Sequence, residues 1–115
     1  MINSELKPIF PAGYVSGLAN SVPVIYYGES MKPKYLHGCI LLCKPCNPAG
    51  ALLPGVVYLA ESAKKGAKIV GRFKSKSPAG VITLIPENSD FGPYELQPSE
   101  IQNFARVVGS LTIEE

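Results

Sequence analysis

The sequence VVYLAESAKKGAKIVGRF at residues 56–73 decides the fold class of this chain. Its two ends, Val56–Glu61 and Lys68–Phe73, are rich in the β-branched and aromatic residues that favour strands. Lys64–Gly66 lies between them and is polar with one glycine, which is typical of a three- to five-residue hairpin loop. The stretch therefore predicts two antiparallel strands joined by a short turn.

The rest of the chain repeats this alternation of short apolar segments and turns. Eleven glycines and eleven prolines interrupt the 115 residues, so long helices are not expected. A single helical turn is expected at Pro98-Ser99, and further strands are predicted at Val22–Tyr27, Cys39–Cys43, Val81–Ile85 and Ala105–Ile113. The chain is therefore predicted to be mostly β, with about six or more short strands in one folded-over sheet system.

Length and composition limit the organisation of the chain. A chain of 115 residues is the size of one domain, and 46% hydrophobic residues argue against disorder. Residues 1–21 mix prolines and glycines with scattered apolar residues and are expected to form an N-terminal arm. Residues 22–115 are then the folded domain.

Charge and cysteine content exclude several classes of function. The net charge of +2 is too small for a domain that grips DNA phosphates by itself, and the apolar runs are too short to span a bilayer. Three cysteines and no signal-peptide pattern indicate a protein of the reducing cytoplasm. We therefore expect no membrane association and no direct DNA contact from this domain.

Ser30 is the first candidate for chemistry. It follows Gly28-Glu29 at the end of an apolar strand and precedes Met31 and Pro33, so it is expected at a sharp corner. Such a corner can expose a hydroxyl and direct consecutive backbone N–H groups at one point, as an oxyanion hole requires. Turn statistics favour the plainer interpretation, a serine that satisfies turn backbone groups.

His37 and the three cysteines allow two further interpretations. A catalytic triad would need His37, the one histidine, but its position beside Gly38 is more typical of a solvated turn. With His37, the cysteines at 39, 43 and 46 could supply four zinc ligands, although Cys39 and Cys43 share one face of an apolar strand. Free cysteine on such a face packs as a small hydrophobe, so no metal and no cofactor are predicted.

Several ordered blocks of the sequence resemble the LexA-like serine peptidase family. The blocks are Gly28–Pro33, Leu36–Leu42, Val70–Phe73, Leu84–Phe91 and an ending at Ile101–Gly109. The match extends roughly from Val22 to Ile113, which is most of the chain. The resemblance implies the mostly-β domain found at the C-terminus of LexA and of phage repressors, and in UmuD-like polymerase accessory proteins.

The resemblance also implies an activity and its residues. Domains of this family dimerise and cut their own chain with a serine nucleophile that a neutral lysine activates. Ser30 matches the nucleophile, and the Met31 backbone N–H matches an oxyanion donor. Ala12-Gly13 matches the dipeptide that the family cuts in an upstream arm. Burial turns such a lysine into a usable base because it disfavours the charged amine.

The sequence departs from this family pattern at the base. The family's lysine stands in a strand motif Val-Lys-Arg-Leu, and the matching residues here are VGRF at 70–73, which places Gly71 at the lysine position. Strand alternation points Lys68 and Lys74 to the opposite face from residue 71, unless a bulge at Gly71 turns a neighbouring lysine round. We therefore expect impaired proteolysis, with Gly71→Lys as the substitution most able to restore it.

Two smaller departures follow. The first concerns the segment between Ala12-Gly13 and the strand that leads to Ser30. Residues 14–21 can span at most about 26 Å, and they must run back along a six-residue strand of about 20 Å and still make a turn. Cleavage of Ala12-Gly13 by Ser30 of the same chain is therefore sterically tight. Gly38-Cys39 replaces the family's Gly-Asp pair, which affects the hydrogen bonds of that turn rather than the fold.

Three functions are consistent with these residues. The first is a dimerising regulatory domain of a LexA-like or phage-type transcriptional repressor, whose helix-turn-helix lies outside this chain and which acts in a pathway such as the SOS response. The second is a UmuD-like polymerase accessory protein. The third is a binding module that keeps the fold without proteolysis. The resemblance implies a homodimer in each case, with a recombinase filament or a polymerase as a further partner. The apolar terminal strand Ala105–Ile113 is the candidate edge for pairing with a second copy.

Overall fold

The fold is an antiparallel β-structure, in agreement with the predicted class. A computed structural model describes residues 6–8, 21–64 and 66–113. Its elements are β1 (Leu6–Pro8), β2 (Val22–Ile25), β3 (Ile40–Pro45), β4 (Val57–Ser62), β5 (Ala67–Lys76), β6 (Ile82–Ile85), β7 (Tyr94–Leu96), the 3-10 turn η4 (Pro98–Glu100) and β8 (Ile101–Ile113). No α-helix occurs in these residues, and none of their helical segments is long and apolar enough to cross a membrane.

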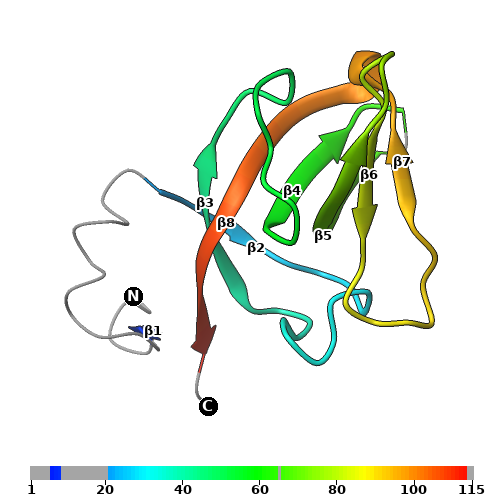
Figure 1. Cartoon of the computed structure of the whole chain (residues 1–115). Coiled ribbons are helices and arrows are strands. Elements are labelled where there is room, and N and C mark those ends of the chain that lie inside the picture. Colours follow the sequence, from blue (N-terminus) through cyan, green and yellow to red (C-terminus); the bar gives the residue numbers. More distant parts are fainter. Residues whose placement is uncertain (1–5, 9–20, 65, 114–115) are drawn as a thin grey trace.

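The strands form one sheet in which the C-terminal strand is central. The order is β2-β3-β8-β4-β5-β6-β7, with β1 also paired to β8. Residues 101–106 of β8 pair with β4, residues 105–111 pair with β3, and residues 111–113 pair with β1. In Figure 1, β8 runs across the molecule as one long curved ribbon between the two groups of strands.

The position of β8 bears on one expectation from the sequence, that the apolar terminal strand Ala105–Ile113 offers an edge to a second copy. β8 is an inner strand of the described sheet, because it forms ladders with both β3 and β4. Its ladder with β4 ends at Arg106, however, and residues 107–110 pair with β3 alone. Pairing of a second copy along this part of β8 stays a prediction.

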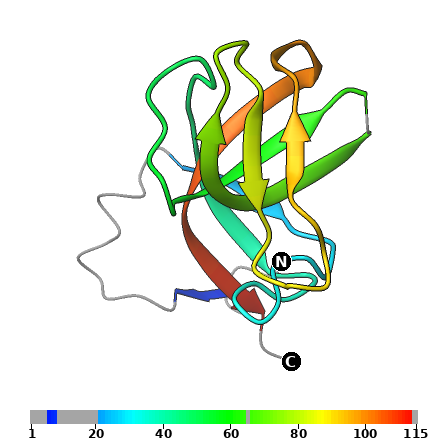
Figure 2. The same ribbon diagram turned by 45° about the vertical axis from the view of Figure 1, so that its right-hand side comes forward.

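Irregular pairings curl the sheet. The register shifts where Leu42 and Cys43 face Gly109 and Val107, and again where Glu61 and Ser62 meet β8. A third shift lies between Phe73 and Ser75 in the pairing with β6. Such bulges increase the local twist and bend a strand. Figure 2 shows the resulting shape, with β5, β6 and β7 standing as a curved wall beside β8.

Two hydrophobic clusters lie on opposite faces of the central strands. Neighbouring residues divide between them by strand alternation: Leu59 and Ala105 belong to the first cluster, and Tyr58 and Phe104 to the second. The first contains Tyr26, Met31, Cys39, Leu41, Cys43, Val57, Leu59, Val70, Ala105 and Val107. The second contains Tyr58, Ala60, Ile69, Phe73, Ile82, Leu84, Leu96 and Phe104. The curled sheet thus buries both of its faces.

Each predicted strand has a counterpart, and two strands were not predicted. No strand was expected at β7, and β8 begins at Ile101 rather than at Ala105. Part of the N-terminal arm is also regular, because Leu6–Pro8 pairs with residues 111–113. The helical turn expected at Pro98 is confirmed as η4.

The expected core packing of two cysteines is confirmed. Cys39 and Cys43 are buried in the first cluster, whereas Cys46 is exposed, and all three are free thiols. Burial raises the pKa of Cys43 to about 11 and also raises the pKa of Cys39. Burial raises the pKa of Cys46 as well, so access rather than protonation distinguishes this exposed thiol from the two buried ones.

We therefore predict that iodoacetamide at pH 8 modifies Cys46 of the folded chain and leaves Cys39 and Cys43 intact. Denaturation should make all three thiols reactive. Intact-mass spectrometry measures the number of adducts, and a Cys46→Ser variant provides the control, which should gain no adduct while folded. Two or more adducts on the folded chain would contradict the burial of this pair.

Candidate active site

The turn between β2 and β3 carries Ser30 and Met31 and is closed by backbone hydrogen bonds. The Tyr26 N–H donates to the Cys39 carbonyl at 2.9 Å, and the Gly38 N–H donates to the Tyr26 carbonyl at 2.7 Å. Met31 is completely buried in the first cluster, whereas Ser30 is partly exposed. The buried methionine anchors the corner, and the serine next to it stays accessible at the surface, as the sequence predicted.

The hydroxyl of Ser30 has a tyrosine as its partner. The Tyr26 hydroxyl lies 3.0 Å from Ser30 Oγ, and the Met31 backbone N–H donates to the same tyrosine oxygen at 3.2 Å. A Cβ on Gly28 would lie 3.1 Å from that oxygen, so a larger residue at this position would crowd the tyrosine hydroxyl. Tyr26 belongs to the predicted strand Val22–Tyr27, but nothing in the sequence pattern signalled that its hydroxyl would contact Ser30.

The loop after β6 holds the corner from another side. The Asn88 N–H donates to the Ser30 carbonyl at 2.8 Å, and Asn88 Nδ2 donates to the Glu29 carbonyl at 3.0 Å. In both views the loop between β6 and β7 comes down beside the turn between β2 and β3 (Figures 1 and 2). Asn88 lies in the block Leu84–Phe91 that carried the family resemblance, and its role is to fix the backbone on either side of the Glu29–Ser30 peptide bond.

Lys32, the lysine nearest to Ser30 in sequence, is engaged elsewhere. Its amine forms an ion pair with Glu29. The hydrogen bond from Lys32 is the main reason why the pKa of Glu29 lies below its ordinary value. Over residues 21–64 and 66–113, no lysine amine hydrogen-bonds the Ser30 hydroxyl, whose one partner there is Tyr26. Among the described residues, the hydrogen-bond partner of the Ser30 hydroxyl is therefore a tyrosine and not an amine.

Gly71 lies in a regular stretch of β5. It faces Tyr58 in an unbroken ladder with β4 that runs from Val57 to Ser62, so no bulge at Gly71 turns a neighbouring lysine round. The irregular position of β5 is three residues later, between Phe73 and Ser75. Both lysines that flank this stretch, Lys68 and Lys74, are exposed.

Residue 71 is also closely approached by the neighbouring strand β6. A Cβ at Gly71 would lie 3.0 Å from the Ile85 carbonyl oxygen and 3.0 Å from Leu84 Cβ. The backbone of β6 therefore occupies the direction in which a side chain would leave β5. This adds a steric cost to the Gly71→Lys substitution, which the sequence pattern alone presented as a simple replacement.

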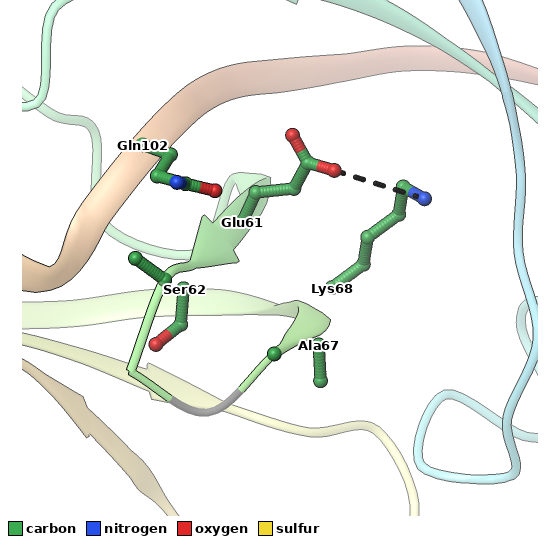
Figure 3. Close-up of a pocket in the computed structure, with 7 residues that line it drawn as sticks. Glu61, Ser62, Ala67, Lys68 and Gln102 are labelled. Carbon is green, nitrogen blue, oxygen red and sulfur yellow. Dashed lines mark ion pairs between the residues drawn. The ribbon is translucent and has the colours of Figure 1, made fainter.

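Lys68 belongs to a separate polar cavity at the β4–β5 turn. Its amine lies 3.8 Å from Glu61 Oε2, and both side chains border the cavity shown in Figure 3. The cavity has a volume of about 270 Å³ and is lined by Glu61, Ser62, Ala63, Gly66, Ala67, Lys68 and Gln102. Ser30, Met31 and Gly71 do not line it, so Lys68 is not part of the predicted site.

His37 is exposed in its turn and pairs with the backbone. Its Nδ1 accepts a hydrogen bond from the Gly28 N–H at 3.0 Å, and its ring packs against Tyr27 with the centroids 5.4 Å apart. Nδ1 is then unprotonated, and His37 helps to hold the corner that contains Ser30. The described residues contain no group of three or more His, Cys, Asp or Glu side chains that could hold a metal ion.

These features were compared with known families. A family model described as Peptidase S24-like matches residues 10–108, which is most of the chain, and its LexA and UmuD members are the proteins that the sequence blocks resemble. The chain belongs to the Peptidase S24-like family. A comparison with curated proteins gave no match.

Membership of the S24-like family gives the corner its context. The predicted nucleophile Ser30 and the predicted oxyanion donor Met31 N–H are adjacent and are bridged by one tyrosine oxygen. Gly71 stands on a different strand, where the family resemblance places a lysine. The predicted cleavage dipeptide Ala12-Gly13 lies outside the described residues. The roles of these residues remain predictions from the resemblance.

The packing around residue 71 leads to a stability prediction. Gly71→Ala should destabilise the chain by about 1–3 kcal/mol, because the new methyl group overpacks against β6. Gly92→Ala is the matched control, since a Cβ there would meet nothing within 4 Å. Its free energy of unfolding should change by no more than about 0.5 kcal/mol. Urea denaturation measures both, and equal effects would contradict the close approach of β6.

Proposed function

We propose that this S24-like chain is the dimerising regulatory domain of a LexA-like or phage-type transcriptional repressor, with self-cleavage impaired because Gly71 replaces the lysine base. Family membership supports a LexA-like peptidase fold. The finer role rests on the residues around Ser30. A domain that keeps the fold but not the base would retain dimerisation as its contribution to repression.

The observation that carries this proposal is the identity of the Ser30 partner. A neutral lysine amine offers a lone pair that can take the serine proton. A tyrosine hydroxyl carries a proton of its own, and in its hydrogen bond with Ser30 either oxygen could be the donor. With Tyr26 at 3.0 Å and no lysine amine bonded to Ser30 in the described residues, proton removal from the serine lacks its usual acceptor.

Dimerisation gives such a domain a function without chemistry. Joining two DNA-reading heads raises the affinity for a two-fold operator, because the second head binds at a high effective concentration. The net charge of +2 is consistent with DNA contacts made by a separate helix-turn-helix rather than by this domain. In an intact family member, cutting the arm would undo this gain in affinity.

The first prediction from this proposal concerns self-cleavage. The purified chain should remain uncut at Ala12-Gly13 even at pH 10, near the ordinary lysine pKa of about 10.4. Mass spectrometry after prolonged incubation tests this, with Ser30→Ala as the control for adventitious proteolysis. A product that starts at Gly13 and appears in the unaltered chain but not in the control would refute the loss of the base.

Introducing a lysine at residue 71 tests whether the missing base is what limits self-cleavage. Because Ile85 and Leu84 approach residue 71 closely, Gly71→Lys alone should restore little cutting and should lower stability. Efficient cutting by Gly71→Lys, absent in a Gly71→Lys/Ser30→Ala double variant, would show that β6 yields easily. It would also place residue 71 within reach of Ser30.

A further prediction concerns the oligomeric state. Sedimentation velocity of the full chain at tens of micromolar should give the mass of a dimer, twice 12.3 kDa. Dilution into the nanomolar range should dissociate it and give an equilibrium constant. A monomer at the higher concentration would count against the repressor role, whatever the outcome of the cleavage assay.

A further inference from the structure

A cavity of about 340 Å³ lies where the start of β2 meets β3, β4 and β8. Its floor is formed by Cys43, Leu59 and Ala105, which are buried members of the first hydrophobic cluster. Val22 and Val24 form one wall, and Val22 is 47% exposed, so it lies at the opening. Small-molecule sites are typically apolar hollows of about 300–1,000 Å³ with a few polar groups that orient the ligand. The cavity has this size and this lining.

The cavity is separate from the predicted peptidase residues. Ser30, Met31 and Gly71 do not line it. After Val24 the chain still passes through the rest of β2 and the turn at Gly28 before it reaches Ser30. A molecule bound in the cavity would therefore not contact the serine corner.

One end of the cavity carries an ion pair with spare hydrogen-bonding capacity. Lys68 Nζ lies 3.8 Å from Glu61 Oε2, beyond the usual limit of about 3.2 Å for a hydrogen bond. Glu61 Oε1 accepts a hydrogen bond from Asn103 Nδ2 at 2.6 Å, which orients the carboxylate. Figure 3 shows the Glu61 and Lys68 side chains extending from neighbouring strands toward each other. Among the described residues, the Lys68 amine and Glu61 Oε2 can thus each bind a closer partner of opposite charge.

The two charges decide which ligand fits this end of the cavity. A carboxylate alone would pair with Lys68 but would lie beside the Glu61 carboxylate, and an amine alone would lie beside the Lys68 amine. A ligand that carries both groups on one carbon can place its carboxylate at Lys68 and its ammonium at Glu61, so that the four charges alternate in sign. An apolar side chain on the same carbon can then enter the cavity between Val24 and Leu59.

From this charge pattern and this lining we propose that the cavity binds a free α-amino acid with a large apolar side chain. Lys68 holds the α-carboxylate, Glu61 holds the α-ammonium, and the side chain packs on Cys43, Leu59 and Ala105. The inference goes beyond the proposed function, because it gives the domain a site for a small-molecule signal that does not depend on self-cleavage.

A ligand series tests the proposal on the unaltered full chain. L-phenylalanine should bind with a dissociation constant on the order of 1 mM, as expected for a small ligand with few polar contacts. Hydrocinnamate lacks the ammonium and phenethylamine lacks the carboxylate. Each should bind at least about 5-fold more weakly, because a charge-assisted hydrogen bond at a partly exposed site is lost. Glycine lacks the apolar side chain and should not bind measurably. NMR titration of the isotope-labelled chain measures the affinities and should show shifts at the residues that line the cavity.

Charge variants give a readout that a structural role would not move. Lys68→Met leaves the Glu61 carboxylate without its amine, so phenethylamine should bind more tightly than hydrocinnamate. Glu61→Gln leaves the Lys68 amine without its carboxylate, so this preference should reverse. Both variants should weaken phenylalanine binding at least about 5-fold. Lys74→Met is the matched control and should bind phenylalanine like the unaltered chain, because Lys74 is an exposed lysine of the same strand that does not line the cavity.

Two results with the unaltered chain would overturn the proposal, whether or not the variants fold. The first is the absence of shifts at the cavity residues at about ten times the expected dissociation constant. The second is equal affinity for phenylalanine, hydrocinnamate and phenethylamine, which would exclude recognition of both charges. Neither result bears on the repressor role, which the self-cleavage and sedimentation experiments test separately.

Discussion

The hydrogen-bonded ladders on both sides of β8 are the constraint on which the structure depends. This strand joins β2 and β3, which lead into and out of the Ser30 corner, to the group of strands that contains β5 and Gly71. It also separates the two hydrophobic clusters, with Phe104 on one face and Ala105 on the other. The distance between the serine corner and the strand that would carry a base is therefore fixed by backbone pairing rather than by contacts within the site.

The corner itself is held by packing and by backbone hydrogen bonds. Met31 is buried below it, Asn88 binds the carbonyls of Glu29 and Ser30, and Tyr26 binds from the core side. None of these contacts requires a reaction to occur. The shape of this corner therefore follows from the fold and does not depend on proteolysis.

Much of the fold could be predicted from the sequence, and the omissions have physical causes. Strands rich in β-branched residues between Gly and Pro turns were found, since that signal is local. The start of β8 was missed because Gln102 and Asn103 are polar, and β7 because it has three residues. The central place of β8 depends on long-range pairing, which no local pattern contains. For the site, the motif identified Ser30 and Gly71, but the Tyr26 hydroxyl and the approach of β6 arise only when distant segments pack together.

The close contact between β5 and β6 has a consequence for how this protein could change over time. Where the backbone of a neighbouring strand fills the room beside a glycine, any side chain added at that position is sterically opposed. A lysine at residue 71 would require Ile85 to retreat, because its Cβ would lie 3.0 Å from the Ile85 carbonyl oxygen. Substitutions at the surface of the domain meet no such barrier and are accommodated more readily.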